Sequence, residues 1–254
     1  MREYLLFRVY GTIVSWGDIT VGEIRPTAQH PSKSAVIGLI SASFGYKREQ
    51  VEEISLLSAS VGYAVRVDAE GIPLRDYHTS QKPDSGTGRN ARTFYTRREE
   101  LLHDKIDTSL SSRDYRTDAL YTVCLWLKDG ASITLTSIEE RLRNPVFQQY
   151  FGRKSCVISL PIHGQIHIAE SIASAFEEIS LLDEKLFLWN TFRKGSHTRY
   201  FWEECNHHGF PKDSLRMKTL RRDEPRSRTR WQFGERYEYS AVISNKQEQE
   251  ANDE

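Results

Sequence analysis

Hydrophobic and polar residues follow patterns along the chain that predict both strands and helices. Residues 3–11, EYLLFRVYG, are rich in leucine, valine and aromatic side chains and therefore predict a first strand. A run of small and apolar residues follows Ser32, which predicts a helix that Ser32 caps and Gly45 terminates. Gly62 is a candidate bulge in a later strand. The same patterns predict further strands at residues 60–68, 74–79 and 115–127 and helices at 49–60 and 137–143.

The order of these elements predicts an α+β fold. Strand, helix, strand, strand, excursion and strand is the order of a ferredoxin-like sheet of the RNA-recognition type. The paired aromatic residues with which such a sheet stacks bases are missing from the sequence, so we expect a variant of that module. We expect a ferredoxin-like domain over residues 1–150 with an insertion at about 80–118, a second region over 151–245, and a disordered acidic tail over 246–254.

Composition and charge narrow the class of protein. Of the 254 residues, 38% are hydrophobic and 28% are charged, as in most globular proteins. The 35 basic and 35 acidic residues cancel, so a nucleic-acid surface has to come from local segregation of charge. The longest apolar runs are much shorter than the roughly 20 residues of a membrane span, and we expect no signal peptide before the first strand. Three well-separated cysteines form no disulfide framework, and we expect a cytoplasmic protein without membrane contact.

The start of the predicted helix after Ser32 is a candidate phosphate site. A helix N-terminus presents unpaired backbone N–H groups and about half a positive charge. Lys33 and the hydroxyl groups of Ser32 and Ser34 lie in its first turn, and Arg25 lies in the loop before it. An ordinary capped core helix explains the same residues, and this alternative stays open from the sequence alone.

Two further segments are locally basic. Residues 81–98 carry five basic side chains against one acid, with Phe94 and Tyr95 among them, and such a mixture can clamp phosphates and stack on bases. A solvated loop is the alternative explanation for that segment. Residues 193–236 contain twelve lysines and arginines against six acidic residues. Residues 152–155, GRKS, offer a glycine beside two basic residues, although a plain turn explains the same four letters.

The sequence indicates binding rather than catalysis. Tyr77 and His78 could act as an acid/base pair in metal-free RNA cleavage, but a tyrosine and histidine at a strand end more often anchor a sheet or contact a ligand. Cys205, His207 and His208 are close in sequence, yet no second ligand pair follows at zinc-like spacing. We therefore predict no catalytic residue, no metal site and no cofactor.

Six short blocks stand in the order that is seen in CasD proteins, so the chain resembles the CasD family. Members of this family are the subunit of the type I-E CRISPR surveillance complex, Cascade, that holds the 5′ handle of the guide RNA (crRNA). The resemblance covers residues 1–165 and 220–240. The blocks are Gly11 with Ser15-Trp16-Gly17, Arg25-Pro26-Thr27, Pro31-Ser32-Lys33-Ser34 with Gly38-Leu39, Leu74-Arg75-Asp76-Tyr77-His78-Thr79, Gly152-Arg153-Lys154-Ser155-Cys156 and Arg222-Asp223-Glu224-Pro225.

The resemblance implies a modified ferredoxin-like fold of the repeat-associated (RAMP) type, with a long β-hairpin thumb at about 80–118 and a small β-rich C-terminal region. It implies one copy per complex, at the end of the CasC backbone and near the large subunit CasA, with target DNA nearby through the complex. It also implies an RNA-binding surface whose residues are Trp16, Arg25, Ser32, Lys33, Ser34, Tyr77, His78, Arg92, Arg97, Arg98, Gly152, Arg153, Lys154, Ser155 and Arg222.

Two other functions remain open at this stage. Relatives in type I-C systems cut precursor guide RNA themselves, so a metal-independent endoribonuclease is the first alternative. In type I-E systems a separate CasE endonuclease cuts, and the blocks present here are those of type I-E. The second alternative is a protein scaffold whose basic patches meet acidic partners without RNA. Residues 175–211 match the family poorly, and no role is transferred to them.

Overall fold

The fold is built around one large, mainly antiparallel sheet. The computed structural model describes residues 1–20, 22–83, 93–102, 106–179, 197–227 and 229–244. Within these residues the strand order is β6-β1-β5-β3-β7-β9-β8, and β2 and β4 also pair with β5. The elements are β1 (Arg2–Val14), β2 (Ile24–Arg25), α1 (Lys33–Phe44), α2 (Val51–Ser60), β3 (Val61–Ala69), β4 (Ile72–Pro83), α3 (Arg97–Leu101), β5 (Ile106–Leu127), α4 (Leu135–Arg143), β6 (Gly164–Ala169), α5 (Ile172–Glu178), β7 (His197–Glu203), a 3₁₀ turn (Lys212–Ser214), β8 (Leu215–Ser227) and β9 (Gln232–Ser244).

The strand and helix predictions are confirmed, with two differences. Strand β5 begins at Ile106, nine residues before the apolar stretch that predicted it, because its first half pairs with β4 outside the core. Gly62 is not a bulge, since the β3–β5 register is continuous there and shifts only between Val67 and Ala69. A Cβ atom at Gly62 would lie 1.9 Å from the Trp126 ring, so this glycine makes room for the tryptophan.

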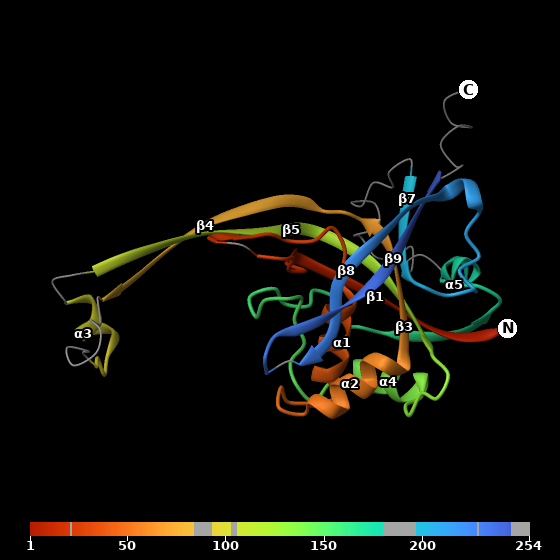
Figure 1. Cartoon of the computed structure of the whole chain (residues 1–254), viewed down its shortest axis with the longest axis horizontal. Coiled ribbons are helices and arrows are strands. Elements are labelled where there is room, and N and C mark those ends of the chain that lie inside the picture. The colour runs from red at the N-terminus through yellow and green to blue at the C-terminus, as the bar shows by residue number, and fades with distance from the viewer. Residues whose placement is uncertain (21, 84–92, 103–105, 180–196, 228, 245–254) are drawn as a thin grey trace, which may run out of the picture.

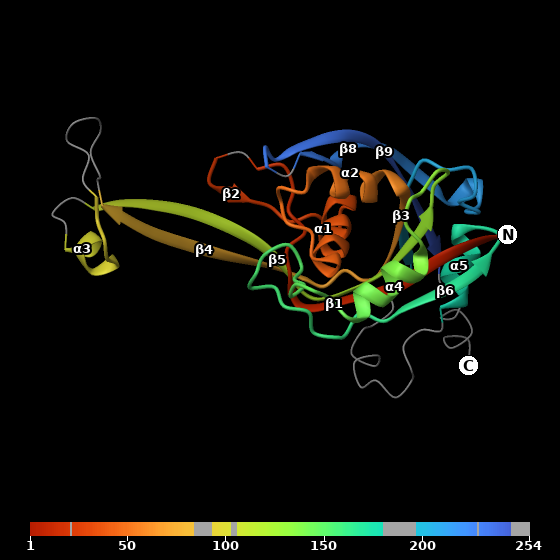
Figure 2. The same cartoon turned by 90° about the horizontal axis from the view of Figure 1, so that it is seen from below.

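Alternate residues of the strands supply two separate cores on the two faces of the sheet. On β1, Leu5 and Phe7 face a core that includes apolar residues of α1, α2 and α4. Tyr4 and Leu6 face the other side, where they join Phe176 of α5 and the 202–210 segment. Figures 1 and 2 show α1, α2 and α4 on one side of the sheet and α5 on the other. The sheet is therefore covered on both faces.

A long hairpin of β4 and β5 projects from this body (Figures 1 and 2). The two strands pair from Ile72 with Thr117 to Pro83 with Ile106, and most of their projecting side chains are exposed. Short helix α3 lies at its far end (Figure 1). The paired strands begin at Ile72, before residues 80–118, where the sequence predicts an insertion.

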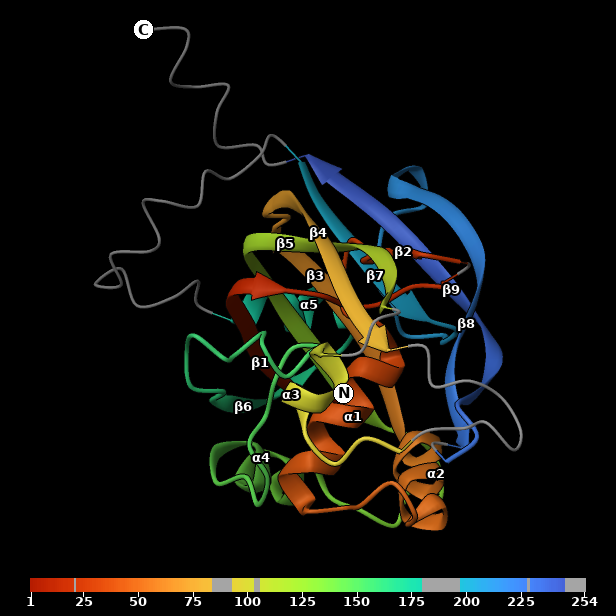
Figure 3. The ribbon, with the colours of Figure 1, turned by 90° about the vertical axis from the view of Figure 1, so that its left-hand side faces the viewer.

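The strands that follow α4 join the same sheet as the first half of the chain. Strand β6 pairs with β1, and β7 pairs with β3 and then with β9. The β8–β9 hairpin lies beside α1 and α2, as the end-on view in Figure 3 shows. The predicted tail at 246–254 lies outside the described residues. None of the helices in the described part of the chain has the length and apolar character to cross a membrane.

Candidate nucleic-acid interface

An open groove of about 1260 Å³ lies between α1 and the β8–β9 hairpin. Its lining comes from four parts of the chain that are distant in sequence: residues 15–26, the α1 helix and the loop after it, residues 147–153, and residues 220–233. The α1 wall is formed largely by small side chains, among them Ser34, Ala35 and Ala42. Such a wall lets a ligand approach the helix backbone closely.

Two capping residues set the ends of α1, the helix that forms this wall. The Ser32 hydroxyl accepts a hydrogen bond from the backbone N–H of Ala35, and Gly45 ends the helix with φ of 80°. Val36, Ile37 and Ile40 are buried against the sheet, so the opposite face of α1 is left for the groove. The predicted helix, its N-cap and its C-cap are confirmed.

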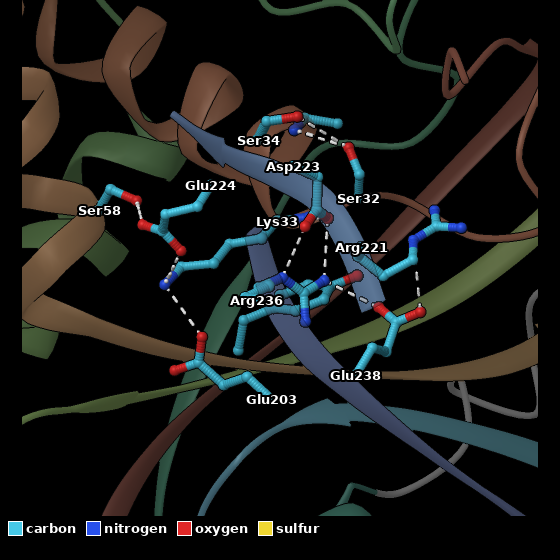
Figure 4. Close-up of polar contacts among 12 residues, drawn as sticks. Ser32, Lys33, Ser34, Ser58, Glu203, Arg221, Asp223, Glu224, Arg236 and Glu238 are labelled. Atoms are coloured by element: carbon cyan, nitrogen blue, oxygen red, sulfur yellow. Dashed lines mark hydrogen bonds and ion pairs between the residues drawn. The ribbon is translucent and has the colours of Figure 1, made fainter. Parts of the chain in front are cut away.

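The position of Lys33 differs from the prediction. Its side chain is 1% exposed, and its ammonium group lies 3.0 Å from a carboxylate oxygen of Glu203 and 2.9 Å from one of Glu224 (Figure 4). Burial alone would lower the pKa of Lys33, but the charges and hydrogen bonds of the two glutamates raise it. The ammonium group therefore stays charged, and carboxylates inside the protein balance its charge. It does not reach the surface where a phosphate would lie.

The N-terminus of α1 is also occupied by the protein itself. The backbone N–H of Lys33 donates a hydrogen bond of 2.8 Å to a carboxylate oxygen of Asp223 in β8. Arg236 of β9 binds both oxygens of the same carboxylate, at 2.7 and 2.9 Å (Figure 4). A side-chain carboxylate therefore takes the place that the sequence assigned to a phosphate, and the phosphate-seat prediction for this helix N-terminus is corrected.

These residues belong to a buried ionic network that fastens the β8–β9 hairpin to the body. Arg236 also donates a 2.8 Å hydrogen bond to Glu238, whose second oxygen lies 3.3 Å from His30. Burial alone would raise the pKa of Glu238, but the hydrogen bond and charge of His30 and the charge of Arg236 lower it to about 2. Within the Arg222–Pro225 block, the two acidic residues are therefore structural, while the Arg222 side chain is exposed.

Three of the predicted arginines line the groove, each from a different part of the chain. They are Arg25, Arg153 and Arg222. The Arg153 guanidinium lies over the Tyr115 ring at 4.5 Å, and it donates a long hydrogen bond of 3.4 Å to the backbone carbonyl of Arg25. Arg222 forms an exposed ion pair of 2.6 Å with Glu235. The fold thus gathers cations that are spread over almost 200 positions of sequence onto one surface.

Gly152 and Trp16 line the groove and are tightly packed. Gly152 has φ of 86°, and a Cβ atom there would lie 1.6 Å from the Ser15 carbonyl oxygen. The Trp16 ring is 6% exposed and packs on Tyr121 and Phe151 with centroids 5.6 and 5.5 Å apart. Although both residues line the groove, the burial of Trp16 leaves its ring faces no room for a base. Trp16, which the resemblance placed on the RNA-binding surface, is therefore not available to stack on a base.

The other predicted residues lie elsewhere. Lys154 and Ser155 are exposed at the turn next to Gly152 but do not line the groove. Tyr77 and His78 lie on β4, where consecutive side chains point to opposite faces of the hairpin, so the two do not face one substrate atom together.

Arg97 and Arg98 lie in α3 at the end of the hairpin, where Arg97 pairs with Glu100 at 2.7 Å. Arg92 is outside the described residues. The predicted residues that the structure describes are therefore divided among the groove, the hairpin and the exposed turn at 154–155, with Lys33 inside the body.

Several groove residues were missed in the sequence. Lys47 and Arg48 lie in the loop after α1, and Arg221, Trp231 and Phe233 come from the β8–β9 hairpin. The signal that could have found the last three is the basic excess in residues 193–236, in which Trp231 directly follows a run of arginines. The excess does not tell which of its side chains point into a groove and which face away.

No candidate metal site emerges from the part of the chain that the structure describes. Within those ranges, no three or more histidine, cysteine or acidic side chains gather as they would around a metal ion. Cys124 and Cys205 are reduced, and burial raises the pKa of both thiols, that of Cys205 to about 11. The Cys205 region is thus part of an apolar core and not of a ligand set.

Comparison with known proteins identifies the class of protein to which this fold and groove belong. The family model described as "CRISPR-associated protein (Cas_Cas5)" matches residues 4–238, and the chain therefore belongs to this family. It is also 34% identical over 170 residues to the "CRISPR system Cascade subunit CasD" of Escherichia coli (strain K12), an alignment that covers 64% of this chain and 70% of that protein. The resemblance to CasD proteins that the sequence blocks indicate is confirmed.

Two solved structures share the fold. One, titled "CRISPR RNA-guided surveillance complex", has a TM-score of 0.58 at 21% identity and covers 95% of this chain and 90% of its own. The other, titled "Crystal structure of Cas protein", has a TM-score of 0.56 at 20% identity and covers 95% of both chains. The arrangement of helices on a large antiparallel sheet is therefore that of known CRISPR-associated proteins.

Proposed function

We propose that this protein is a non-catalytic subunit of a type I-E Cascade complex and that it holds the 5′ handle of crRNA in the groove. Its family membership and its similarity to a Cascade subunit support the class of function. The observation that carries the proposal is the convergence of Arg25, Arg153 and Arg222 on one groove beside the small-residue wall of α1. A single-stranded backbone needs such a basic channel, because each phosphate bears a negative charge.

The arginines and the helix wall have different roles in this proposal. The three guanidinium groups bind successive phosphates, and the small side chains on the half-buried face of α1, among them Ser34, let the strand lie close to the protein. The α1 N-terminus does not take part, because Asp223 already accepts its N–H group. Handle bases that are splayed out of the strand present edges for sequence-specific hydrogen bonds, as in most RNA recognition.

The long β4–β5 hairpin is the proposed thumb. Its exposed strands and the basic residues near its end, Arg97 and Arg98, are suited to contact the guide where the handle meets the spacer. We infer that the body is a modified ferredoxin-like RAMP domain, since β1, β3, β5 and β6 form an antiparallel sheet in the order β6-β1-β5-β3. In the complex the protein then caps the CasC backbone and lies near CasA and the target DNA, in the cytoplasm.

The test is a salt titration of handle-RNA binding by single arginine variants. For Arg25→Ala, Arg153→Ala and Arg222→Ala, we expect weaker binding and a salt slope that is smaller by about 0.7 for each lost phosphate contact on a single strand. The matched control is Arg143→Ala, an exposed arginine of α4 that does not line the groove and pairs with Glu139. Slopes that stay at the wild-type value in all three groove variants would reject the groove as the RNA site.

A second experiment separates the proposal from the two alternatives. Pure protein is incubated with a repeat hairpin in EDTA, and a cut at the 5′ end of the handle would show a metal-independent endoribonuclease. The opposite faces of Tyr77 and His78 on β4 are the reason that we expect no cut. Nuclease treatment of the purified complex addresses the scaffold: we expect protected RNA to travel with the protein, whereas RNA-free assembly would favour a scaffold.

A further inference from the structure

An exposed tryptophan stands at the rim of the groove. Trp231 lies in the turn between β8 and β9, and its side chain lines the groove together with Phe233. It is 58% exposed, whereas Trp16, Trp126 and Trp202 are at most 6% exposed. Single exposed apolar residues are common on protein surfaces, and Trp231 is distinguished by its place on the groove lining beside Phe233.

A cation from a distant part of the chain lies over this ring. The Arg48 guanidinium, from the loop between α1 and α2, is 5.1 Å from the centroid of the Trp231 ring. Both residues line the groove, so an aromatic face and a positive charge stand together at its edge. This pairing is the combination with which proteins bind single-stranded nucleic acid, because the ring stacks on a base while the cation meets the adjacent phosphate.

The backbone of Trp231 is held in an unusual conformation. Its φ is 51°, which is uncommon for a bulky residue, because the Cβ atom then crowds its own carbonyl group. Glycine or asparagine would fit such a turn position better. The conformation of the turn therefore gives no reason for a tryptophan at this position.

We propose that Trp231 is a nucleobase-stacking residue of the groove and that Arg48 orients its ring and contacts the phosphate next to the stacked base. This inference rests on the proposed function of the groove as the crRNA handle site. The ligand is a single-stranded RNA base, since the groove beside the ring is lined by Arg25, Arg153 and Arg222, whose charges suit a phosphate backbone. Stacking is tolerant of base identity, so Trp231 adds affinity and register, and sequence discrimination comes from other contacts.

The test uses the full-length chain and a labelled single-stranded RNA that carries the repeat-derived handle. For Trp231→Ala we expect binding that is weaker by roughly fivefold to a hundredfold, the range for loss of one base–aromatic stack. Trp231→Phe keeps an aromatic face and should retain most of the affinity. The matched control is Tyr237→Ala, since Tyr237 is also an exposed aromatic residue of β9 but does not line the groove. Thermal melts of each variant establish that the fold is intact.

Two readouts identify stacking itself. Handle RNA should quench the tryptophan fluorescence of the wild-type protein, and Trp231→Phe should remove most of that quenching. In a series of RNAs with single abasic positions, one position should weaken binding by the wild-type protein but not by Trp231→Ala, because the base and the ring are lost from the same contact.

The outcomes separate this inference from the proposed function. If Trp231→Ala binds handle RNA as tightly as wild type while the groove arginine variants bind more weakly, Trp231 stacks on no base and the groove proposal stands. If the wild-type chain does not bind handle RNA at all, the proposed function itself fails. If Trp231→Ala reduces only nuclease-resistant assembly with protein subunits, the tryptophan is a protein contact and the inference is overturned.

Discussion

The Lys33 ammonium group lies at the centre of the contacts between α1, β7 and β8. It pairs with Glu203 and Glu224, and the Ser58 hydroxyl donates a further hydrogen bond to Glu224. Removal of one partner from a buried ion pair leaves charge without compensation and is strongly destabilising. Lys33, which the sequence suggested as a phosphate ligand, is therefore expected to stabilise the fold.

We expect Lys33→Met to lower the free energy of unfolding by about 3 kcal/mol, measured by urea denaturation, because buried Glu203 and the partly exposed Glu224 lose the cation that lies between them, although Glu203 keeps Lys128. The exposed Lys154→Met should change it by less than about 0.5 kcal/mol. Under conditions in which the Lys33 variant is folded, its RNA salt slope should equal that of wild type. A stable variant with a smaller slope would return Lys33 to the RNA-binding surface.

The network also predicts how stability depends on acid. The pKa of Glu238 is lowered from 4.5 to about 2 in the folded protein, so its contribution is fully present above about pH 4.5 and is lost as the pH falls toward 2. The linked contribution is of the order of 3 kcal/mol. Urea midpoints measured from pH 7 to pH 3 should fall less steeply for Glu238→Gln than for wild type, and equal slopes would contradict this role of Glu238.

At the scale of the element, the 151–155 turn depends on one residue without a side chain. Gly152→Ala would place a Cβ atom 1.6 Å from the Ser15 carbonyl and force the turn away from the groove floor. We expect a loss of stability of more than about 2 kcal/mol and weaker handle binding. Gly130 is the matched control, since its φ of 77° is similar and no atom lies near its Cβ position. Gly130→Ala should cost about 1 kcal/mol in thermal or urea unfolding and leave RNA binding unchanged.

The comparison of elements shows what local sequence can predict. Helix α1 was predictable with both ends because Ser32 and Gly45 are local signals that act within one turn. The first half of β5 was not, because residues 106–114 lie outside the core and carry no apolar pattern, although their backbone pairs with β4. The Arg222–Pro225 block has the composition of a binding surface. Asp223 of this block is buried because β8 lies beside α1, where Lys33 is 190 positions away in sequence.

The difference between local and tertiary signals also explains which groove residues could be predicted from the sequence. Among the three arginines that line the groove, Arg25 and Arg153 were identified from local sequence, the loop before α1 and the GRKS turn, whereas Arg222 came from the resemblance to CasD proteins. Trp231 and Arg48 become a pair only through tertiary structure, since each belongs to a different loop. Burial of Lys33 could not be inferred for the same reason, because it depends on Glu203 and Glu224, which come from β7 and β8.

At the scale of the whole molecule, the body and the hairpin have separable roles. Residues 79–83 and 106–110 of the hairpin are mostly exposed, so they contribute little to the core. Replacement of residues 79–110 by Asn-Gly should join His78 and Ser111, which are paired, through a two-residue turn. We expect a melting temperature within about 3 °C of wild type.

Assembly of the shortened protein with guide RNA and the other subunits should be impaired, as judged by co-purification, if the hairpin is the thumb. The full-length chain, purified in parallel, is the control. A cooperative loss of folding in the shortened protein would show that the hairpin belongs to the body, and full assembly would show that it is not the thumb.

The origin of the groove walls has a consequence for synthesis. The ribosome completes α1 and the 147–153 turn before it has made residues 220–233, which supply the opposite wall and the carboxylate at the α1 N-terminus. At typical elongation rates this interval lasts roughly 4–14 s. Until residue 203 is made Lys33 has neither glutamate partner, and until residue 224 is made it has only Glu203, while the groove has only one wall. If the groove holds guide RNA as proposed, a nascent chain cannot bind it there until the β8–β9 hairpin is complete.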